Sequence, residues 1–318
     1  MIRLFPITSL NYNILNELST HEFFKKNKIG FTDDINKSDI FVARRFDDEV
    51  FKIIDSWLAS QSIKTRPILI WTHEPRFCKT DQHIQDDIIS APIYNMNMYT
   101  KNVYFSNFSI YGSKIALKIP PMLDVSFSEK SICALATYVY EEKQRFVLNG
   151  IDIDLAIKRQ NLIYDGYLKG KVDVFGRGWP KSIALSESRY DDRQMSKQKI
   201  LQNYQFNICM ENTSFPYYCS EKIWESIIGH CLPIYSSFNN AIYETFPEDS
   251  FIDYDKFENS QELYSYIDRL SKQDYLNRLN LCIDTFNRCY DEVDFEIEKQ
   301  KSLEALVNKI RIIYDEPS

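Results

Sequence analysis

The sequence predicts an α/β protein made of two Rossmann-like, doubly wound domains that face a cleft. Short apolar runs alternate with polar, helix-like segments in both halves of the chain, and this alternation is typical of parallel sheets covered by helices on both faces. The length of 318 residues fits two domains, and a hydrophobic fraction of 44% can fill two cores. We expect an N-terminal domain over residues 1–150 and a C-terminal domain over 151–318 that includes closing C-terminal helices.

Strands in the first half are predicted from runs of β-branched and aromatic residues. These runs are residues 2–7, 39–44, 67–74 and 102–107. Residues 47–61 predict a helix between them, because their apolar side chains recur at helical spacing. The polar segment 141–154 is the best candidate for the domain boundary.

The second half repeats the pattern. Residues 154–170 predict a helix that ends at Gly170, and residues 220–230 predict one with Ser220 as N-cap and Gly229 at its end. Strands are predicted within 171–179, 203–212, 231–237 and 249–257. From Gln261 the chain predicts helices, the last of which has the apolar stripe Leu303, Leu306, Val307, Ile310 and Ile313.

Composition excludes several classes of protein. The net charge of −7 argues against general attraction to nucleic acid or anionic lipid. The seven cysteines lack the paired spacing of a zinc site or a disulfide framework. No apolar run reaches the ~20 residues of a membrane span, and the N-terminus lacks the apolar region of a signal peptide. We therefore expect a cytoplasmic protein without a transmembrane segment, and leave peripheral membrane association open.

The loop 211–222 is the first candidate site, because ligands of parallel sheets bind beyond the carboxyl ends of the strands. A helix N-terminus attracts phosphate, and a lysine in the first turn is unfavourable unless an anion lies nearby. A capped helix with solvated charges is the alternative. The chemistry-bearing residues of the loop are Glu211, Asn212, Tyr217, Tyr218, Ser220, Glu221 and Lys222.

Glu74 is the second candidate, since it follows a strand that should be buried and precedes Pro75. A carboxylate at that position suits a general base. His73 could compete for the role, and an ordinary solvated acid is the alternative.

Two further patterns carry weaker signals. Gly176 and Gly178 flank Arg177 after a predicted strand and could approach a nucleotide closely, although a tight turn explains them as well and the dinucleotide fingerprint is absent. Asp152 and Asp154 form an Asp-x-Asp pattern of the kind that holds a metal–diphosphate, but in a boundary segment.

The run "FNICMENTSFPYYCSEKIWESIIGHCLPIY" and the later "SFIDYDKF" resemble the donor-binding signature of the alpha-1,3/1,4-fucosyltransferases, glycosyltransferase family 10. "KVDVFGRG", "WTHEPRF" and "YNMNMYTKNVYF" resemble earlier signatures of that family, so the likeness covers about residues 67–270. The matching positions are Phe206, Glu211, Asn212, Thr213, Tyr218, Glu221, Lys222, Pro233, Ile234, Ser250, Phe251, Ile252 and Phe257.

The resemblance implies an inverting GT-B enzyme that moves L-fucose from GDP-fucose to a hydroxyl of an N-acetylglucosamine- or glucose-containing glycan, with alpha-1,3 linkage expected first. The N-terminal domain would bind the oligosaccharide acceptor and the C-terminal domain the GDP-sugar. No cofactor is required, although Mn or Mg could stimulate turnover. There are two alternatives: a GT-B transferase that uses another GDP- or UDP-sugar as donor, and an inactive glycan-binding scaffold.

The resemblance also implies roles for individual residues. Glu74 takes the place of the catalytic base. Lys222 and Arg159, with Lys158 as the alternative to Arg159, match residues that contact the diphosphate, and Glu221 matches one near the ribose. The remaining donor-binding positions are Asn212, Tyr218, Ser220 and Gly176.

The sequence departs from the family pattern at several positions. Ser220 stands where the family has Thr, and Cys219 precedes it. Tyr235-Ser236-Ser237 replaces the usual residues after Pro-Ile, which could shape the pocket for another sugar. Residues 98–101 also differ from the animal members.

Overall fold

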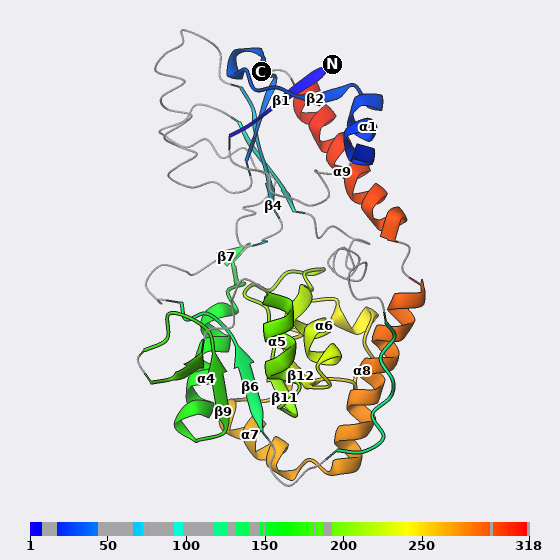
Figure 1. Ribbon diagram of the computed structural model, residues 1–318. Coiled ribbons are helices and arrows are strands. Elements are labelled where there is room, and N and C mark those ends of the chain that lie inside the picture. The colour runs from blue at the N-terminus through cyan, green and yellow to red at the C-terminus, as the bar shows by residue number, and fades with distance from the viewer. Residues whose placement is uncertain are drawn as a thin grey trace. The chain divides into compact units, whose positions relative to one another are not determined.

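The computed structural model describes residues 1–7, 18–43, 66–72, 75, 92–97, 117–125, 131–139, 147–148, 150–180, 182–186, 193–292 and 295–316. Contacts divide the chain into two units: Met1–Ser106 with Phe295–Ser318, and Asn107–Asp294. The helix predicted over 47–61 and the strand predicted over 102–107 lie outside the described residues. Figure 1 draws the residues outside the described ranges as a thin grey trace.

The first unit contains a parallel sheet whose described strands lie in the order β2-β1-β3-β4-β5. This is the flavodoxin-like order of doubly wound sheets. All five residues of β4 are buried, as expected for a strand covered on both faces. The strands are β1 (Ile2–Pro6), β2 (Ile29–Phe31), β3 (Ile40–Ala43), β4 (Ile68–Thr72) and β5 (Ile93–Asn97), and α1 (Leu18–Lys26) connects β1 to β2.

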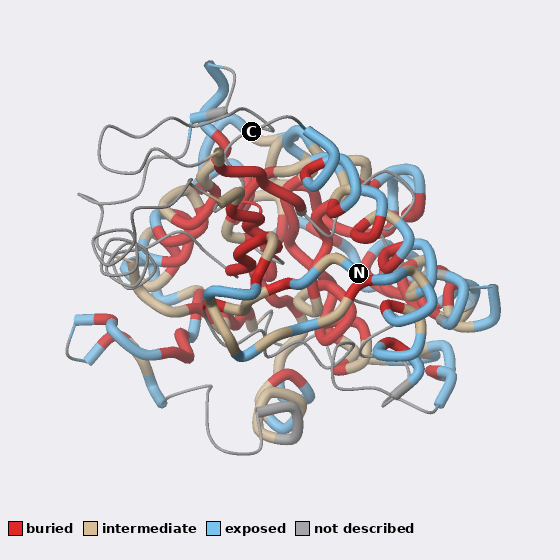
Figure 2. The backbone as a smooth tube through the Cα atoms, turned by 90° about the horizontal axis from the view of Figure 1, so that it is seen from above, coloured by how far each residue is buried: buried red, intermediate tan, exposed pale blue. Residues whose placement is uncertain are grey.

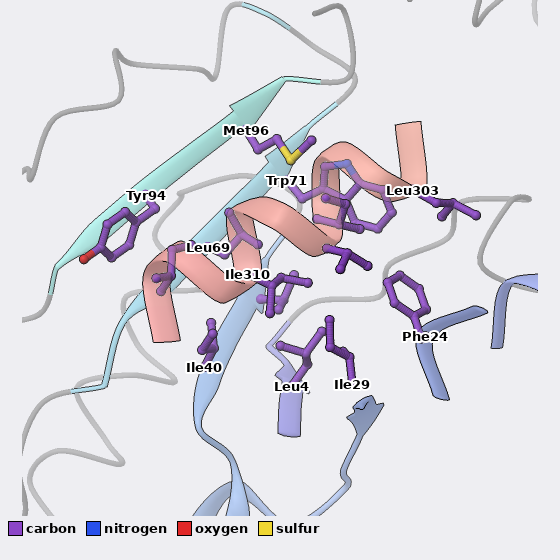
Figure 3. Packing of buried hydrophobic residues seen from close by; sticks show 14 residues of the cluster. Leu4, Phe24, Ile29, Ile40, Leu69, Trp71, Tyr94, Met96, Leu303 and Ile310 are labelled. Atoms are coloured by element: carbon purple, nitrogen blue, oxygen red, sulfur yellow. The ribbon is translucent and has the colours of Figure 1, made fainter. Parts of the chain in front are cut away.

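The C-terminal helix α9 (Phe295–Asp315) packs in the core of this first unit. Its predicted apolar stripe is buried against strand residues such as Leu69, Trp71 and Met96 (Figure 3). Strand side chains alternate between faces, so these residues point to the α9 side of the sheet. The stripe is confirmed, but its place corrects the predicted domain 151–318, because the last helix belongs with the N-terminal strands.

The second unit is built on a parallel sheet in the order β10-β9-β6-β11-β12-β13. Counted along the chain, this is the order 3-2-1-4-5-6 of a Rossmann fold. The strands are β6 (Ile132–Leu135), β9 (Val172–Phe175), β10 (Ala184–Ser186), β11 (Phe206–Ile208), β12 (Leu232–Tyr235) and β13 (Ile252–Asp253). A separate antiparallel pair joins β7 (Val147–Leu148) to β8 (Ile151–Asp152).

Helices α4 (Ala156–Leu168), α5 (Arg193–Leu201), α6 (Glu221–Ile228), α7 (Ser260–Arg269) and α8 (Lys272–Glu292) belong to this unit. Buried and exposed residues alternate along the helical parts of the tube in Figure 2. In α8 the buried residues recur at helical spacing, which gives one apolar stripe. Among the described residues, no helix has the length and apolarity needed to cross a bilayer.

The boundary predicted at residue 150 differs from the observed division at residues 106 and 107. Strand β6 lies before residue 150 but is central in the second sheet, where Ile132 pairs with both Val172 and Phe206. The short apolar run at 132–135 was not recognised as a strand, and the predicted boundary therefore cut the second domain.

Candidate functional site

A pocket in the second unit lies at the carboxyl ends of β6 and β11. Chain order reverses between these two neighbouring strands, and doubly wound sheets bind ligands at such a switch point. Thr137 and Cys209 line the pocket from the strand side, Arg159 from α4, Lys197 from α5, and Glu221 and Lys222 from α6.

Glu211 organises the loop between β11 and α6. Its side chain is 2% exposed. Oε1 accepts a hydrogen bond from the backbone N–H of Ser220 at 2.6 Å, and the Ser220 hydroxyl lies 2.7 Å from both carboxylate oxygens. The Tyr235 hydroxyl donates to Oε1 at 3.3 Å. A buried carboxylate is tolerated only with such partners.

Lys222 is the cationic partner of Glu211. Its Nζ donates to Glu211 Oε2 at 2.8 Å and to the Ser220 hydroxyl at 2.6 Å. Burial alone would lower the pKa of Lys222, but attraction by Glu211 and Glu221 outweighs burial and holds that pKa above its usual value. The anion expected beside this first-turn lysine is therefore present within the protein, as Glu211.

Ser220 stands at the N-cap of α6 as predicted, but its side chain makes no capping hydrogen bond. The hydroxyl donates to Glu211 instead. The prediction of a hydroxyl cap was wrong, because a carboxylate nine residues earlier in the chain competes for that hydroxyl.

The Glu221 carboxylate lies between two lysines. Its Oε1 is 3.7 Å from Lys222 Nζ and 3.9 Å from Lys197 Nζ. Burial raises the pKa of Glu221, but Lys222 and Lys197 outweigh burial and lower the pKa to about 2. Glu221 is therefore ionised throughout the neutral range.

Arg159, rather than Lys158, faces the pocket. The Arg159 side chain is largely buried, and its Nη1 donates to the backbone carbonyl of Met210 at 2.8 Å. Lys158, one residue earlier, forms an ion pair with Asp255 and lies 5.2 Å from the ring centroid of Tyr254. Of the two alternatives, the structure brings only Arg159 together with Lys222.

Asn212 and Tyr218 support the loop from other sides. The Asn212 carbonyl accepts a hydrogen bond from the N–H of Leu155 at 3.0 Å, which ties the loop to the start of α4. Tyr218 is 2% exposed, and its carbonyl accepts from Asn240 Nδ2 at 2.8 Å. Neither residue lines the pocket. Tyr217 is half-buried.

Packing explains Gly176. Its φ is 155°, and a Cβ there would lie 2.0 Å from the backbone oxygen of Ala136. Only glycine fits where the end of β9 approaches the chain beyond β6. The close contact with Ala136 explains why position 176 is a glycine, and no ligand is needed for that explanation. Contact of Gly176 with the donor therefore remains a proposal.

The Asp-x-Asp pattern has a structural role. Asp154 Oδ1 accepts hydrogen bonds from the N–H groups of Ala156 at 2.7 Å and Ile157 at 3.4 Å, at the start of α4. Asp152 accepts from the N–H of Asp154. In the described part of the chain, no group of three or more His, Cys, Asp or Glu could hold a metal ion.

Two of the residues predicted for the site are not described by the structure, and two residues of the pocket were not predicted from the sequence. Glu74 and His73 lie outside the described residues, so the prediction of a catalytic base there stays a prediction.

Lys197 and Glu225, which were not predicted from the sequence, form an ion pair of 2.7 Å in the pocket wall. Glu225 lies four residues after Glu221, and residues with this spacing share one face of a helix. The spacing therefore indicates that Glu225 lies on the same side of α6 as the predicted site residue Glu221.

Comparison with known families matches residues 140–278 to the C-terminal part of glycosyltransferase family 10 (fucosyltransferase). This segment contains α4, α5 and α6 and therefore Arg159, Lys197, Glu221 and Lys222.

The similar curated proteins are fucosyltransferases. The chain is 32% identical over 104 residues to the gorilla 4-galactosyl-N-acetylglucosaminide 3-alpha-L-fucosyltransferase FUT6, covering 32% of this chain and 26% of that protein. It is 35% identical over 86 residues to the alpha-(1,3)-fucosyltransferase FucT of Helicobacter pylori, covering 26% of this chain and 18% of that protein. The matches thus span about a quarter or less of these relatives.

Solved structures agree on the fold. A crystal structure of an alpha1,3-fucosyltransferase is similar with a TM-score of 0.50 and 14% identity, covering 100% of this chain and 93% of that one. A DNA-modifying beta-glucosyltransferase is similar with a TM-score of 0.50 and 9% identity, covering 98% and 99%. The predicted GT-B class, two α/β units with parallel sheets, is confirmed. The match to glycosyltransferase family 10 is limited to residues 140–278, which include Arg159 and Lys222.

Proposed function

We propose that this chain is an inverting glycosyltransferase that moves L-fucose from GDP-fucose to a hydroxyl of an N-acetylglucosamine- or glucose-containing oligosaccharide. The observation that carries the proposal is the pairing of Lys222 and Arg159 in one pocket at the switch point of a family 10 domain. Two fixed cations at that position suit a diphosphate.

The donor half of the reaction follows from this geometry. Negative charge grows on the GDP diphosphate as the bond to the sugar breaks. Lys222, held by Glu211, and Arg159, held by the Met210 carbonyl, would stabilise that charge without large rearrangement. The ionised Glu221 carboxylate would accept hydrogen bonds from ribose hydroxyls.

The acceptor half rests on Glu74. Inversion requires one in-line displacement at the anomeric carbon, and the base removes the proton of the attacking hydroxyl during that step. We propose Glu74 for this role from its place in the family-like sequence, with the N-terminal unit as the acceptor-binding part. The scheme needs no cofactor, and a divalent cation could stimulate it by screening the diphosphate.

A donor with a different sugar is the second candidate. The loop that departs from the family pattern, Ser236–Ser237, is held by an acid of the next strand and an acid of the turn after it. The Ser237 hydroxyl donates to Asp253 Oδ2 at 2.6 Å, and the Ser236 hydroxyl donates to Asp255. A loop fixed in this way presents a definite shape, which could select a sugar other than fucose.

Ligand-dependent thermal unfolding separates the candidates. GDP and GDP-fucose should raise the melting temperature at concentrations where UDP and UDP-glucose have no effect. A preference for UDP would overturn the fucosyl assignment. A transfer assay with GDP-fucose on a glycan array then identifies the acceptor. If no acceptor on the array leads to release of GDP, the glycan-binding scaffold is favoured.

A further inference from the structure

Five side chains of alternating charge form a row, of which Lys197, Glu221, Lys222 and Glu225 line the pocket and Glu211 lies behind Lys222. Glu225 Oε2 lies 2.7 Å from Lys197 Nζ, and Lys197 lies 3.9 Å from Glu221 Oε1. Glu221 lies 3.7 Å from Lys222, which lies 2.8 Å from Glu211. The row joins α5 and α6 to the buried Glu211 of the loop after β11, and Glu221 is its central member.

Lys197 is fixed in this row by the packing of α5 on α6. Its side chain is 18% exposed, and that of its partner Glu225 is 11% exposed. The next residue, Gln198, donates from Nε2 to the backbone carbonyl of Glu225 at 3.1 Å. Two consecutive residues of α5 therefore bind one residue of α6, which holds the Lys197 ammonium at a constant place relative to Glu221.

The distances around Glu221 differ from those of the outer pairs. Both lysines stand beyond hydrogen-bonding distance of its carboxylate, so they attract it without donating a hydrogen bond to it. The ion pair with Glu225 neutralises Lys197 at long range, so beyond that partner the field of the lysine acts mainly on the next nearest acid. That acid is Glu221.

We propose that Lys197 is a positioning residue for the donor nucleotide: it holds the Glu221 carboxylate where that group meets the ribose hydroxyls. The inference rests on the proposed function, in which the ligand is a GDP-sugar. Lys197 would thus set affinity for the ribose through Glu221, without contacting the ligand itself.

Calorimetric titration of Lys197→Met with GDP and with 2′,3′-dideoxy-GDP tests the proposal, because the second ligand lacks the ribose hydroxyls. We expect GDP affinity to fall about tenfold and dideoxy-GDP affinity to change less than about twofold. Lys197→Arg should keep most of the GDP affinity. In a Glu221→Gln background, Lys197→Met should have no further effect.

Matched controls separate a positioning role from loss of structure. Lys171→Met removes a lysine of the same unit that pairs with Asp268 at 2.7 Å, and should leave both affinities unchanged. Thermal unfolding of each variant reports the fold. If Lys197→Met does not fold, Lys197→Gln, which keeps a polar side chain but removes the charge, should show the same selective loss for GDP.

Two results would overturn the inference in distinguishable ways. Equal weakening of GDP and dideoxy-GDP in folded Lys197→Met would mean that Lys197 acts on the diphosphate or on the pocket as a whole, while the proposed function stands. A wild-type protein that binds neither nucleotide would overturn the proposed function and this inference together.

Discussion

The Lys222 ammonium and the Glu211 carboxylate form a 2.8 Å ion pair in which the acid is the buried member, 2% exposed against 24% for the lysine. The acid stands behind the lysine and the lysine faces the pocket. A ligand anion would share Lys222 with Glu211, so the pair orients the cation before any ligand arrives.

Lys222→Ala should weaken GDP binding by about tenfold or more, because a charge-assisted contact to the diphosphate is lost. The same change leaves Glu211 buried without its cation, which should destabilise the fold by about 3 kcal/mol. Adding Glu211→Gln should restore part of the stability but not the affinity. Calorimetry and urea unfolding measure the two effects, and unchanged GDP affinity in Lys222→Ala would remove Lys222 from the site.

Glu221 should make the free energy of unfolding depend on pH in the acidic range. Its pKa in the folded state is lowered to about 2, so its contribution is fully present above the unfolded-state pKa of about 4.3 and is lost as pH falls toward 2. Wild-type stability should therefore fall over this window, and Glu221→Gln should show a shallower fall there. Equal slopes for the two proteins in urea unfolding at pH 5, 4 and 3 would contradict the assignment.

Gly176→Ala should destabilise the second unit by about 2 kcal/mol or more, because the new Cβ meets the Ala136 oxygen at 2.0 Å and φ is 155°. Gly170→Ala is the matched control. Its φ is 65° and nothing lies within 4 Å of an added Cβ, so only the backbone cost of about 1 kcal/mol remains. Similar losses in both variants would show that the contact with Ala136 does not matter.

Glu74→Ala should reduce turnover by about 10²–10⁴-fold while GDP binding survives, since a general base acts on the acceptor and not on the nucleotide. Single-turnover rates and calorimetry measure the two quantities. His73→Ala is the natural comparison, because His73 is the competing base. A near-normal rate in Glu74→Ala together with a large loss in His73→Ala would reverse the assignment.

Local patterns predicted much of the second unit. The apolar stripe and N-cap position of α6 are visible in the sequence, and Gly170 with φ 65° ends α4 as expected. The run at 206–257 also pointed to the family whose model matches residues 140–278.

Features that depend on distant partners were not predictable in the same way. The Ser220 hydroxyl leaves its cap because Glu211 competes for it, and Lys197 is recognised only when α5 is seen against α6. Strand β6 was missed because a four-residue apolar run does not by itself identify a central strand.

The position of α9 also has a consequence for synthesis of the chain. Residues 295–315 supply one wall of the core whose strands lie within the first 97 residues. On the ribosome, the Rossmann sheet of the second unit is therefore complete before the first unit receives its last helix. The strands of the first unit are made before the second unit yet finish folding after it, and their apolar face must wait, exposed or chaperoned, until residues 295–315 have emerged.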